Sequence, residues 1–353
     1  YLALCSANLP DTTISPNQDT QADDHFNTVL WTGNATDTNI TGVGFQPDWV
    51  WAKNRSNAYH HALVDSSRGA TKVLKSSATS SEGTFSEQIT GFLADGFSVG
   101  DNSDSGNYVN INSHTYVAWN WKANGGTTSS NTDGNETSTV QVNTDAGFSI
   151  VLWTGGSNVQ THTFGHGLGV KPAMVIHKRR GSTSDWSVWH QGVSSPNDNY
   201  LLLNSQASSN ASTSWEQPTT TVLQPYIGST GDTWVSYVFA EIEGYSKFGS
   251  YTGNGNADGT FVFTGFRPAW IMFKVTNTTG NWNIYDSVRD PDNIVAQKLR
   301  ADGSNAEVTS SDDFDILSNG FKLRDSGAGL NSSSNTYIYM AFAEQPFKFS
   351  NAR

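Results

Sequence analysis

The chain has almost no cysteine and few charged residues. Its 353 residues include a single cysteine, Cys5, so the chain cannot form an internal disulfide and offers no set of thiolates for a metal site. Charged residues make up 15% of the chain, and no run of about 18 apolar residues occurs, so neither a charged coiled coil nor a membrane-spanning helix is expected. Stability must therefore come from packed hydrophobic cores.

Basic residues are also scarce. The 20 Lys and Arg residues are outnumbered by 32 Asp and Glu residues, which gives a formal net charge of −12. A protein that binds a phosphate backbone needs a basic surface, and an anionic membrane repels an acidic one. We therefore expect no nucleic-acid partner and no membrane partner.

Aromatic residues, glycine and small polar residues are abundant instead. Aromatics reach 12% of the chain and there are 33 glycines, set among many Ser, Thr and Asn residues. Aromatic and β-branched side chains cover the pleated faces of strands, while Asn and Gly supply the turns between them. This composition predicts an all-β protein.

A chain laid against itself reveals three repeats. One strand appears as TYVAWNWKA (115–123), TWVSYVFAE (233–241) and TYIYMAFAE (336–344). Large apolar residues recur there at every second position, which is typical of strands that bury one face. We predict that five of these aromatic residues lie in hydrophobic cores: Trp119, Trp121, Tyr237, Phe239 and Phe342.

Other segments repeat in the same order. VLWTGN, VLWTGG and FGSYTGN begin the three copies, and a Gly-x-x-Pro sequence then precedes an apolar strand in each copy. Proline cannot donate to a β-ladder, so it suits the start of a strand. ALVDSSRGA (62–70) in the first copy also corresponds to IYDSVRDP (284–291) in the third.

Each copy contains about seven short strand candidates separated by turn signals. This pattern predicts an all-β chain of three tandem antiparallel β-sandwich modules of the jelly-roll, lectin-like type. The predicted organisation is an extended lead-in (1–24), a first module (25–124), a polar linker (125–147), a second module (148–244) and a third module (245–353). Because the chain opens at Tyr1 without a signal-like stretch, we expect a piece of a longer protein.

The sequence offers few residues for catalysis. GFSVG (96–100) fits the G-x-S-x-G pattern of hydrolases, but it starts at an Asp-Gly turn, and Lys322 stands where Ser98 does. Asp65 and Arg68 match Asp286 and Arg289, which we interpret as an internal ion pair or a turn-holding hydrogen bond present in two copies. We therefore expect no catalytic residues and no enzyme.

No segment has the ligand pattern of a metal or cofactor site. The pairs His60–His61 and His162–His166 lack a third ligand, and GHGLG (165–169) is not followed by the lysine and helix of a phosphate loop. The acidic loops 101–104 and 312–315 have oxygen ligands that could hold calcium, but we interpret them as solvated turns. We expect no cofactor and no metal.

Aromatic residues outside the repeated strands are the candidates for ligand binding. A sugar ring can stack its apolar face on an aromatic side chain while polar groups bind its hydroxyls. Trp186 and Trp282 precede apolar strands, and we interpret them as structural. The remaining candidates for ligand binding are Tyr59, Trp215 and Tyr226.

Several long segments carry a resemblance to a known group of proteins. GFQPDWVWAKNRS, HHALVDSSRGATK and YVAWNWKANGG resemble a module that recurs in virion structural proteins of tailed bacteriophages from aquatic habitats. In the third copy, YSKFGSYTGNGNADG and FVFTGFRPAWIMFK are similar to it as well. The second copy departs from the pattern, because WHQGVSSPND (189–198) replaces the Asp-x-x-Arg segment. The resemblance implies a virion appendage and no catalytic residue.

Two classes of function remain after these exclusions. The first is a virion structural protein, a tail fibre, head fibre or capsid-decorating appendage, located on the particle and able to contact host-surface glycans. Such appendages are commonly trimeric, so we expect a homo-oligomer, with a trimer favoured, and contacts with other virion proteins. The second class is a secreted or cell-surface lectin-like adhesin. A polysaccharide depolymerase is a third and poorer alternative.

Overall fold

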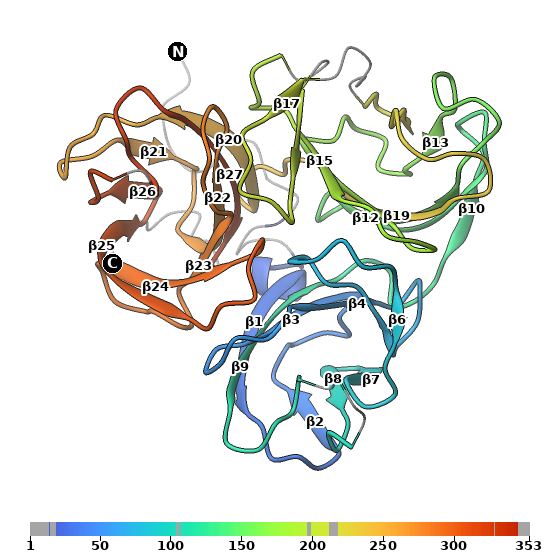
Figure 1. The fold of residues 1–353 in the computed structure, drawn as a ribbon, viewed down its shortest axis with the longest axis horizontal. Helices are drawn as coiled ribbons and strands as arrows, with labels where there is room; N and C mark the ends of the chain where they lie inside the picture. Colours follow the sequence, from blue (N-terminus) through green and yellow to red (C-terminus); the bar gives the residue numbers. More distant parts are fainter. Residues whose placement is uncertain are drawn as a thin grey trace.

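The computed structural model describes residues 14, 19–103, 106, 108–195, 199–211, 218–327 and 329–344. Apart from one turn of 3-10 helix, the regular structure in this part of the chain is antiparallel β-sheet, as the composition predicted. Figure 1 shows three lobes grouped around a common centre. We refer to them as repeat 1 (25–124), repeat 2 (148–244) and repeat 3 (245–344).

Repeat 1 follows the short helix η2 (Ala22–Asp24). Its strands are β1 (Phe26–Thr32), β2 (Thr38–Thr41), β3 (Trp49–Asn54), β4 (Ala62–Asp65), β5 (Lys72–Val73), β6 (Gly83–Thr84), β7 (Ile89–Leu93), β8 (Gly96–Val99) and β9 (Thr115–Trp121). They form an inner sheet in the order β1-β9-β3-β4 and an outer sheet in the order β2-β8-β7.

Repeat 2 uses the same inner strand order. Its strands are β12 (Phe148–Thr154), β13 (Phe164–Gly165), β14 (Met174–Arg179), β15 (Trp186–His190), β16 (Asn199–Leu202), β17 (Asn210–Ala211), β18 (Val222–Leu223) and β19 (Thr233–Phe239). The inner order is β12-β19-β14-β15, while β13 and β18 form a separate pair at the periphery.

Repeat 3 closes its layers into one continuous sheet. Its strands are β20 (Ser246–Thr252), β21 (Phe261–Phe263), β22 (Pro268–Val275), β23 (Asn283–Asp286), β24 (Val295–Arg300), β25 (Val308–Leu317), β26 (Gly320–Leu323) and β27 (Thr336–Ala343). The order β20-β27-β22-β23-β24-β25-β26-β21 bends into a nearly closed, barrel-like sheet, with β21 at its edge.

The polar segment 125–147 contains two strands where the sequence predicted a linker. β10 (Ser129–Asn131) pairs with β11 (Ser138–Asn143), and β11 pairs with β12, so the segment extends the inner sheet of repeat 2. The buried carboxylate of Asp48 holds the start of this segment by accepting hydrogen bonds from the backbone N–H groups of Gly125 and Gly126, at 2.9 and 2.8 Å. The low apolar content hid these strands because β10 has no buried residue and β11 is only partly buried.

The predicted lead-in, 1–24, lies largely outside the described residues. Of those that are described, Ile14 and Ala22 are fully buried in the central core.

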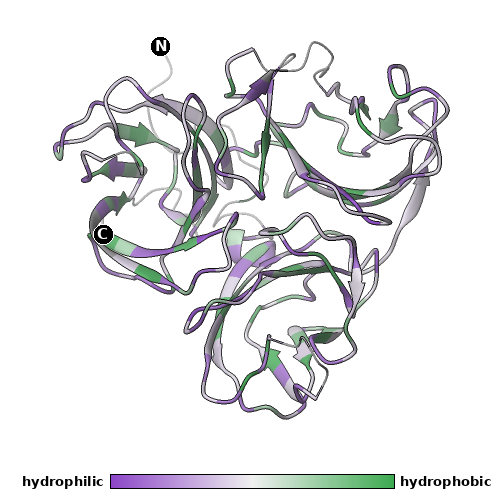
Figure 2. Cartoon of the chain, in the orientation of Figure 1, coloured by the Kyte–Doolittle hydropathy of each residue, from purple (hydrophilic) through white to green (hydrophobic). Residues whose placement is uncertain are grey.

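The inner sheets use their two faces for two different cores. Because side chains alternate along a strand, Trp119 and Trp121 of β9 point into a central core, while Ala118 packs inside repeat 1. Figure 2 shows hydrophobic and polar residues interspersed along these strands. All five residues predicted to be core are at most 1% exposed, which confirms that prediction.

The centre of the molecule is an aromatic cluster to which every repeat contributes. Trp121, Phe239 and Phe342 occupy equivalent positions at the ends of β9, β19 and β27, opposite Trp49, Met174 and Trp270. Their ring centroids are 6.4 Å apart for Trp121 and Phe239, 5.7 Å for Trp121 and Phe342, and 6.0 Å for Phe239 and Phe342. The three repeats therefore meet around a pseudo-threefold axis.

We predict that Trp121→Ala destabilises the whole chain, because the indole contacts rings from all three repeats. Truncation of a buried tryptophan costs about 3–5 kcal/mol of unfolding free energy. Leu30→Ala, on the same sheet but 39% exposed, is the matched control and should cost less than about 1 kcal/mol. Chemical denaturation followed by circular dichroism checks both values, and equal losses in the two variants would contradict the central role of Trp121.

Candidate functional site

Buried ion pairs and hydrogen bonds lie where the repeats meet. The repeated Asp-x-x-Arg segment supplies two of these ion pairs. In repeat 1 the Arg68 side chain donates from Nε to Asp65 Oδ2 at 2.5 Å, and its backbone N–H donates to Asp65 Oδ1 at 2.8 Å. Arg289 and Asp286 make the same two contacts in repeat 3, at 2.5 and 2.8 Å. All four side chains are fully buried, which confirms the predicted structural ion pair.

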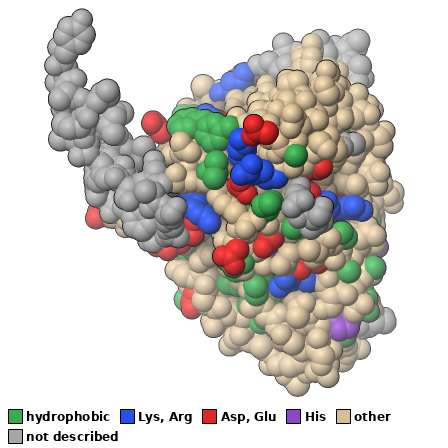
Figure 3. All heavy atoms as spheres, turned by 90° about the vertical axis from the view of Figure 1, so that its left-hand side faces the viewer, with side chains coloured by type: hydrophobic (Ala, Val, Ile, Leu, Met, Phe, Trp, Pro, Cys, Tyr) green, Lys and Arg blue, Asp and Glu red, His purple; other side chains and the backbone are tan. Residues whose placement is uncertain are grey.

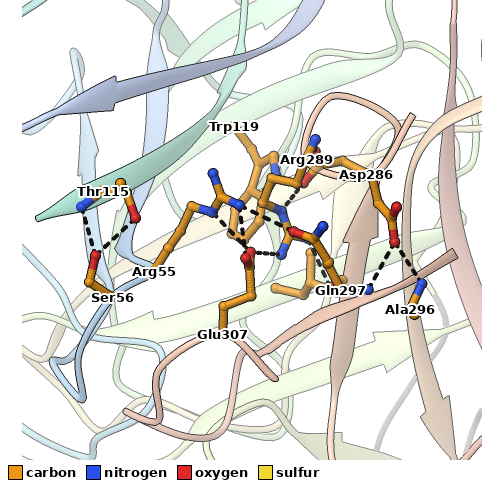
Figure 4. Close-up of polar contacts among 11 residues, drawn as sticks. Arg55, Ser56, Thr115, Trp119, Asp286, Arg289, Ala296, Gln297 and Glu307 are labelled. Carbon is orange, nitrogen blue, oxygen red and sulfur yellow. Dashed lines mark hydrogen bonds and ion pairs between the residues drawn. The ribbon is translucent and has the colours of Figure 1, made fainter. Parts of the chain in front are cut away.

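Each pair is extended by a glutamate that reaches the neighbouring repeat. Arg289 Nη1 lies 2.8 Å from Glu307, and Glu307 also accepts hydrogen bonds from Arg55 of repeat 1, at 3.0 and 2.8 Å (Figure 4). In repeat 1 the corresponding residue is Glu82, which binds Arg68 at 3.0 Å and Arg180 of repeat 2 at 3.0 Å. Both networks therefore join two repeats.

The two glutamates remain ionised because of their partners. Burial alone would raise the pKa of Glu307, but the hydrogen bonds and positive charges of Arg55 and Arg289 outweigh burial and lower this pKa below its ordinary value. The pKa of Glu82 is lowered for the same reason, by Arg180 and Arg68.

The aspartates also receive a hydrogen bond from the neighbouring repeat. Tyr237 of repeat 2 donates its hydroxyl to Asp65 at 2.7 Å, and Trp119 of repeat 1 donates its indole N–H to Asp286 at 2.9 Å. Tyr237 and Trp119 are equivalent positions, two residues before Phe239 and Trp121. The contacts between repeats 1 and 2 thus reproduce those between repeats 3 and 1.

The contact between repeats 2 and 3 replaces this charged network with a neutral one. His190, opposite Met174 in the register, occupies the position of Asp65 and Asp286. Its Nε2 donates to the backbone carbonyl of Tyr339 at 3.2 Å, and its Nδ1 accepts from the backbone N–H of Gly192 at 3.0 Å. Burial lowers the pKa of His190 to about 4, so the ring is neutral at neutral pH.

The residues of repeat 3 at the positions that would face an aspartate also differ from their counterparts in repeats 1 and 2. Met340, whose side chain has no N–H or O–H group, stands where Trp119 and Tyr237 stand, and Thr276 stands where Arg55 and Arg180 stand. A buried aspartate at position 190 would receive no hydrogen bond from the Met340 side chain, whereas Asp65 and Asp286 receive one from Tyr237 and Trp119. This explains why WHQGVSSPND departs from the repeated pattern.

A lysine at one strand position recurs at all three contacts. Lys53, Lys178 and Lys274 are each at most 1% exposed, and each ammonium donates to a backbone carbonyl of a different repeat. The accepting carbonyls belong, in the same order, to Ser304, Thr79 and Gln206, at 3.2, 2.9 and 3.2 Å. Burial lowers the pKa of Lys53 to about 7 and those of the other two to about 8.

A second position, occupied by a side chain with a ring N–H group, also donates a hydrogen bond to a backbone carbonyl of another repeat. His61, Trp186 and Trp282 each lie four residues before the position of Asp65, and each donates across a contact between repeats. The accepting carbonyls belong to Arg300, Lys75 and Leu202, at 2.9, 2.9 and 2.8 Å. Trp186 and Trp282 are structural, as predicted, and His61 is engaged in packing.

The residues predicted to bind ligands are not gathered at one place. Tyr59, in the loop after β3, is half-buried, and its ring lies parallel to Tyr108 at 6.1 Å. Tyr226, in the loop after β18 of repeat 2, is also half-buried. Trp215 lies outside the described residues. A ligand-binding role for these residues stays a prediction.

Ser98 borders a polar hollow on the outer sheet of repeat 1. Its Oγ is bonded to Thr90 Oγ1 at 2.8 Å. The hollow measures about 510 Å³ and is lined by Asp37, Thr38, Asn39, Ser86, Glu87, Thr90, Ser98 and Val99. The only hydrogen bond to a side chain that Ser98 makes among these lining residues is the one with Thr90, and its role as a nucleophile stays untested.

The segment 312–315 belongs to strand β25 (Val308–Leu317), with Asp313 and Asp315 buried, so its interpretation as a solvated turn is wrong; in the loop 101–104, Asp104 lies outside the described residues. Asp313 accepts from the Tyr285 hydroxyl at 2.8 Å, and Asp315 accepts from Arg324 at 2.6 Å. His162 and His166 contact separate backbone carbonyls, those of Pro225 and Thr219. Within the described ranges, no group of three or more His, Cys, Asp or Glu side chains is placed to hold a metal ion.

Comparison with known proteins gives one match. A family model described as a domain of unknown function (DUF7483) covers residues 21–346. No curated protein and no solved structure matches the chain. In the part of the chain that the structure describes, no helix has the length and apolar character needed to cross a membrane.

We predict that Asp286→Asn destabilises the protein by about 3–5 kcal/mol, because it leaves the buried Arg289 without its closest counter-charge. Glu241→Gln is the control, because it removes an ion pair with Lys247 in which both side chains are about one-third exposed. It should lower the unfolding free energy by less than about 1 kcal/mol. Urea denaturation of the two variants measures the difference. Similar losses would mean that the buried pair contributes no more than a surface pair.

We also predict a pH effect that depends on Lys53. The Lys53 ammonium has a pKa of about 7 in the folded protein and of 10.5 in the unfolded chain. Between pH 7 and pH 10.5 the unfolded chain therefore binds more protons than the folded protein. Stability due to Lys53 therefore rises with pH across that window. The unfolding free energy of the native protein minus that of Lys53→Met should increase from pH 7 to pH 10.5, as measured by denaturation at each pH. A constant difference would show that Lys53 is not desolvated.

Proposed function

We propose that this chain, which belongs to the DUF7483 family of domains of unknown function, is a non-enzymatic structural protein of a virion. The role we infer is that of a tail fibre, head fibre or capsid-decorating appendage that also contacts host-surface glycans. We further propose that each repeat is an antiparallel β-sandwich module of the jelly-roll, lectin-like type.

The observation that carries the proposal is the contact of Trp121, Phe239 and Phe342 at the centre, surrounded by two buried ion-pair networks. Three repeats joined in this way behave mechanically as one body, because no repeat can move without exposing a shared core. A particle appendage has to withstand shear and proteases without disulfides, and this chain has a single cysteine. Some of its charged residues, among them Arg55, Glu82 and Glu307, join one repeat to another.

The sequence resemblance supports the same role, since it covers strands of both the first and the third repeat. We propose that copies of the chain associate, with a trimer favoured, and that they contact other virion proteins. A secreted or cell-surface lectin-like adhesin is the second candidate, and the exposed aromatic residues on repeat 3 favour it.

Two measurements test the proposal. Gold-labelled antibodies against the chain should decorate purified particles in electron micrographs, and light scattering should give a solution mass three times the 38.2 kDa of one chain. A monomer found only on cell surfaces or in the medium would overturn the virion role in favour of the adhesin. Glycan hydrolysis by the purified chain would instead indicate a depolymerase.

A further inference from the structure

The strand pair β2-β8 of repeat 1 and the strand pair β21-β26 of repeat 3 share a register but carry different side chains. In β2 and β8, Ile40 lies opposite Phe97, and in β21 and β26, Val262 lies opposite Phe321; these four residues point inward and are buried. The outward positions differ. Asn39, Thr41 and Ser98 of repeat 1 correspond to Phe261, Phe263 and Lys322 of repeat 3.

The two phenylalanines are exposed on the surface of repeat 3. Phe261 is 47% exposed and Phe263 is 61% exposed, the largest exposed fraction among the large hydrophobic residues described. They are two residues apart on the edge strand β21, so both rings stand on its outer face, about 7 Å apart. Repeat 1 folds with polar residues at these positions, so the fold does not require phenylalanine there.

Charged pairs border the two rings. Lys322, directly across from Phe261, forms an ion pair with Asp258 at 2.5 Å, and Arg324 forms one with Asp315 at 2.6 Å. Figure 3, which views the molecule from the side of repeat 3, shows hydrophobic side chains gathered next to Lys or Arg and Asp or Glu side chains. The two pairs cancel in charge, so the border offers donors and acceptors without a net field.

The size of the aromatic surface limits what can bind. A phenylalanine side chain has roughly 200 Å² of surface, so the two rings expose about 200 Å² together. A stable protein interface needs about 800 Å² on each partner, which is several times more. A small, flat ligand with one apolar face fits better than a protein or a second copy of the chain.

We propose that Phe261, Phe263, Lys322 and Asp258 form a binding platform for neutral hexopyranose chains. Two adjacent sugar rings can place their C–H faces on the two phenyl rings, while the Lys322 ammonium and the Asp258 carboxylate, 81% exposed, bond to vicinal hydroxyls. The cancelling charges favour neutral over acidic sugars. This inference deepens the glycan contact in the proposed function and rests on that part of it.

The test uses the full chain and immobilised cello-, malto-, manno- and galacto-oligosaccharides of four to six units. We expect the native chain to bind at least one series, and Phe261→Ala/Phe263→Ala to bind it at least about tenfold more weakly, a change of about 1.4 kcal/mol. Asn39→Ala/Thr41→Ala, at the equivalent positions of repeat 1, is the matched control and should bind like the native chain. Circular dichroism verifies that both double variants fold.

Three outcomes would overturn the platform. They are no binding to any of the four series, equal loss in both double variants, and a drop in solution mass in Phe261→Ala/Phe263→Ala that identifies the patch as a self-contact. Failure of the platform is distinguishable from failure of the virion role, because antibody labelling of particles does not depend on sugar binding. Labelled particles with a negative glycan result would leave the structural role standing alone.

Discussion

The contact of three aromatic side chains at the pseudo-threefold axis is the constraint on which the rest of the structure depends. Trp121, Phe239 and Phe342 can meet only if all three inner sheets turn the same face toward the centre. Because strand side chains alternate, the opposite face of each sheet is then committed to the interior of its own repeat. Both faces are therefore covered, and every residue after the first in β9, β19 and β27 is buried.

Polar groups that lie near this centre have to be satisfied within the protein. Lys53, Lys178 and Lys274 reach carbonyls on a different repeat, and the Asp-Arg pairs are closed by Tyr237 and Trp119. Such groups contribute little net stability but fix one arrangement, since any other leaves a buried charge alone. The hydrophobic centre brings the repeats together, and the polar contacts determine how they are oriented.

The three contacts are not identical. Repeat 1 is joined to repeat 2 and to repeat 3 by ion-pair networks, whereas at the contact between repeats 2 and 3 the neutral ring of His190 stands in place of the buried aspartate. Repeats 3 and 1 are far apart in sequence, and Arg55, Glu307 and Arg289 join them by charge. Away from these contacts the outer sheets vary freely, from the polar hollow of repeat 1 to the exposed Phe261 and Phe263 of repeat 3.

The sequence by itself determined the β class, the three repeats, the aromatic core positions and the pairing of Asp65 with Arg68. These features are local or periodic, so their physical cause lies within a few residues of chain. Only the tertiary structure decided the partners between repeats. Glu82 meets Arg180 from 98 residues away, and no spacing signals that pair. It also revealed strands in the segment 125–147 and the exposure of Phe261, because pairing and burial depend on which neighbour covers a face.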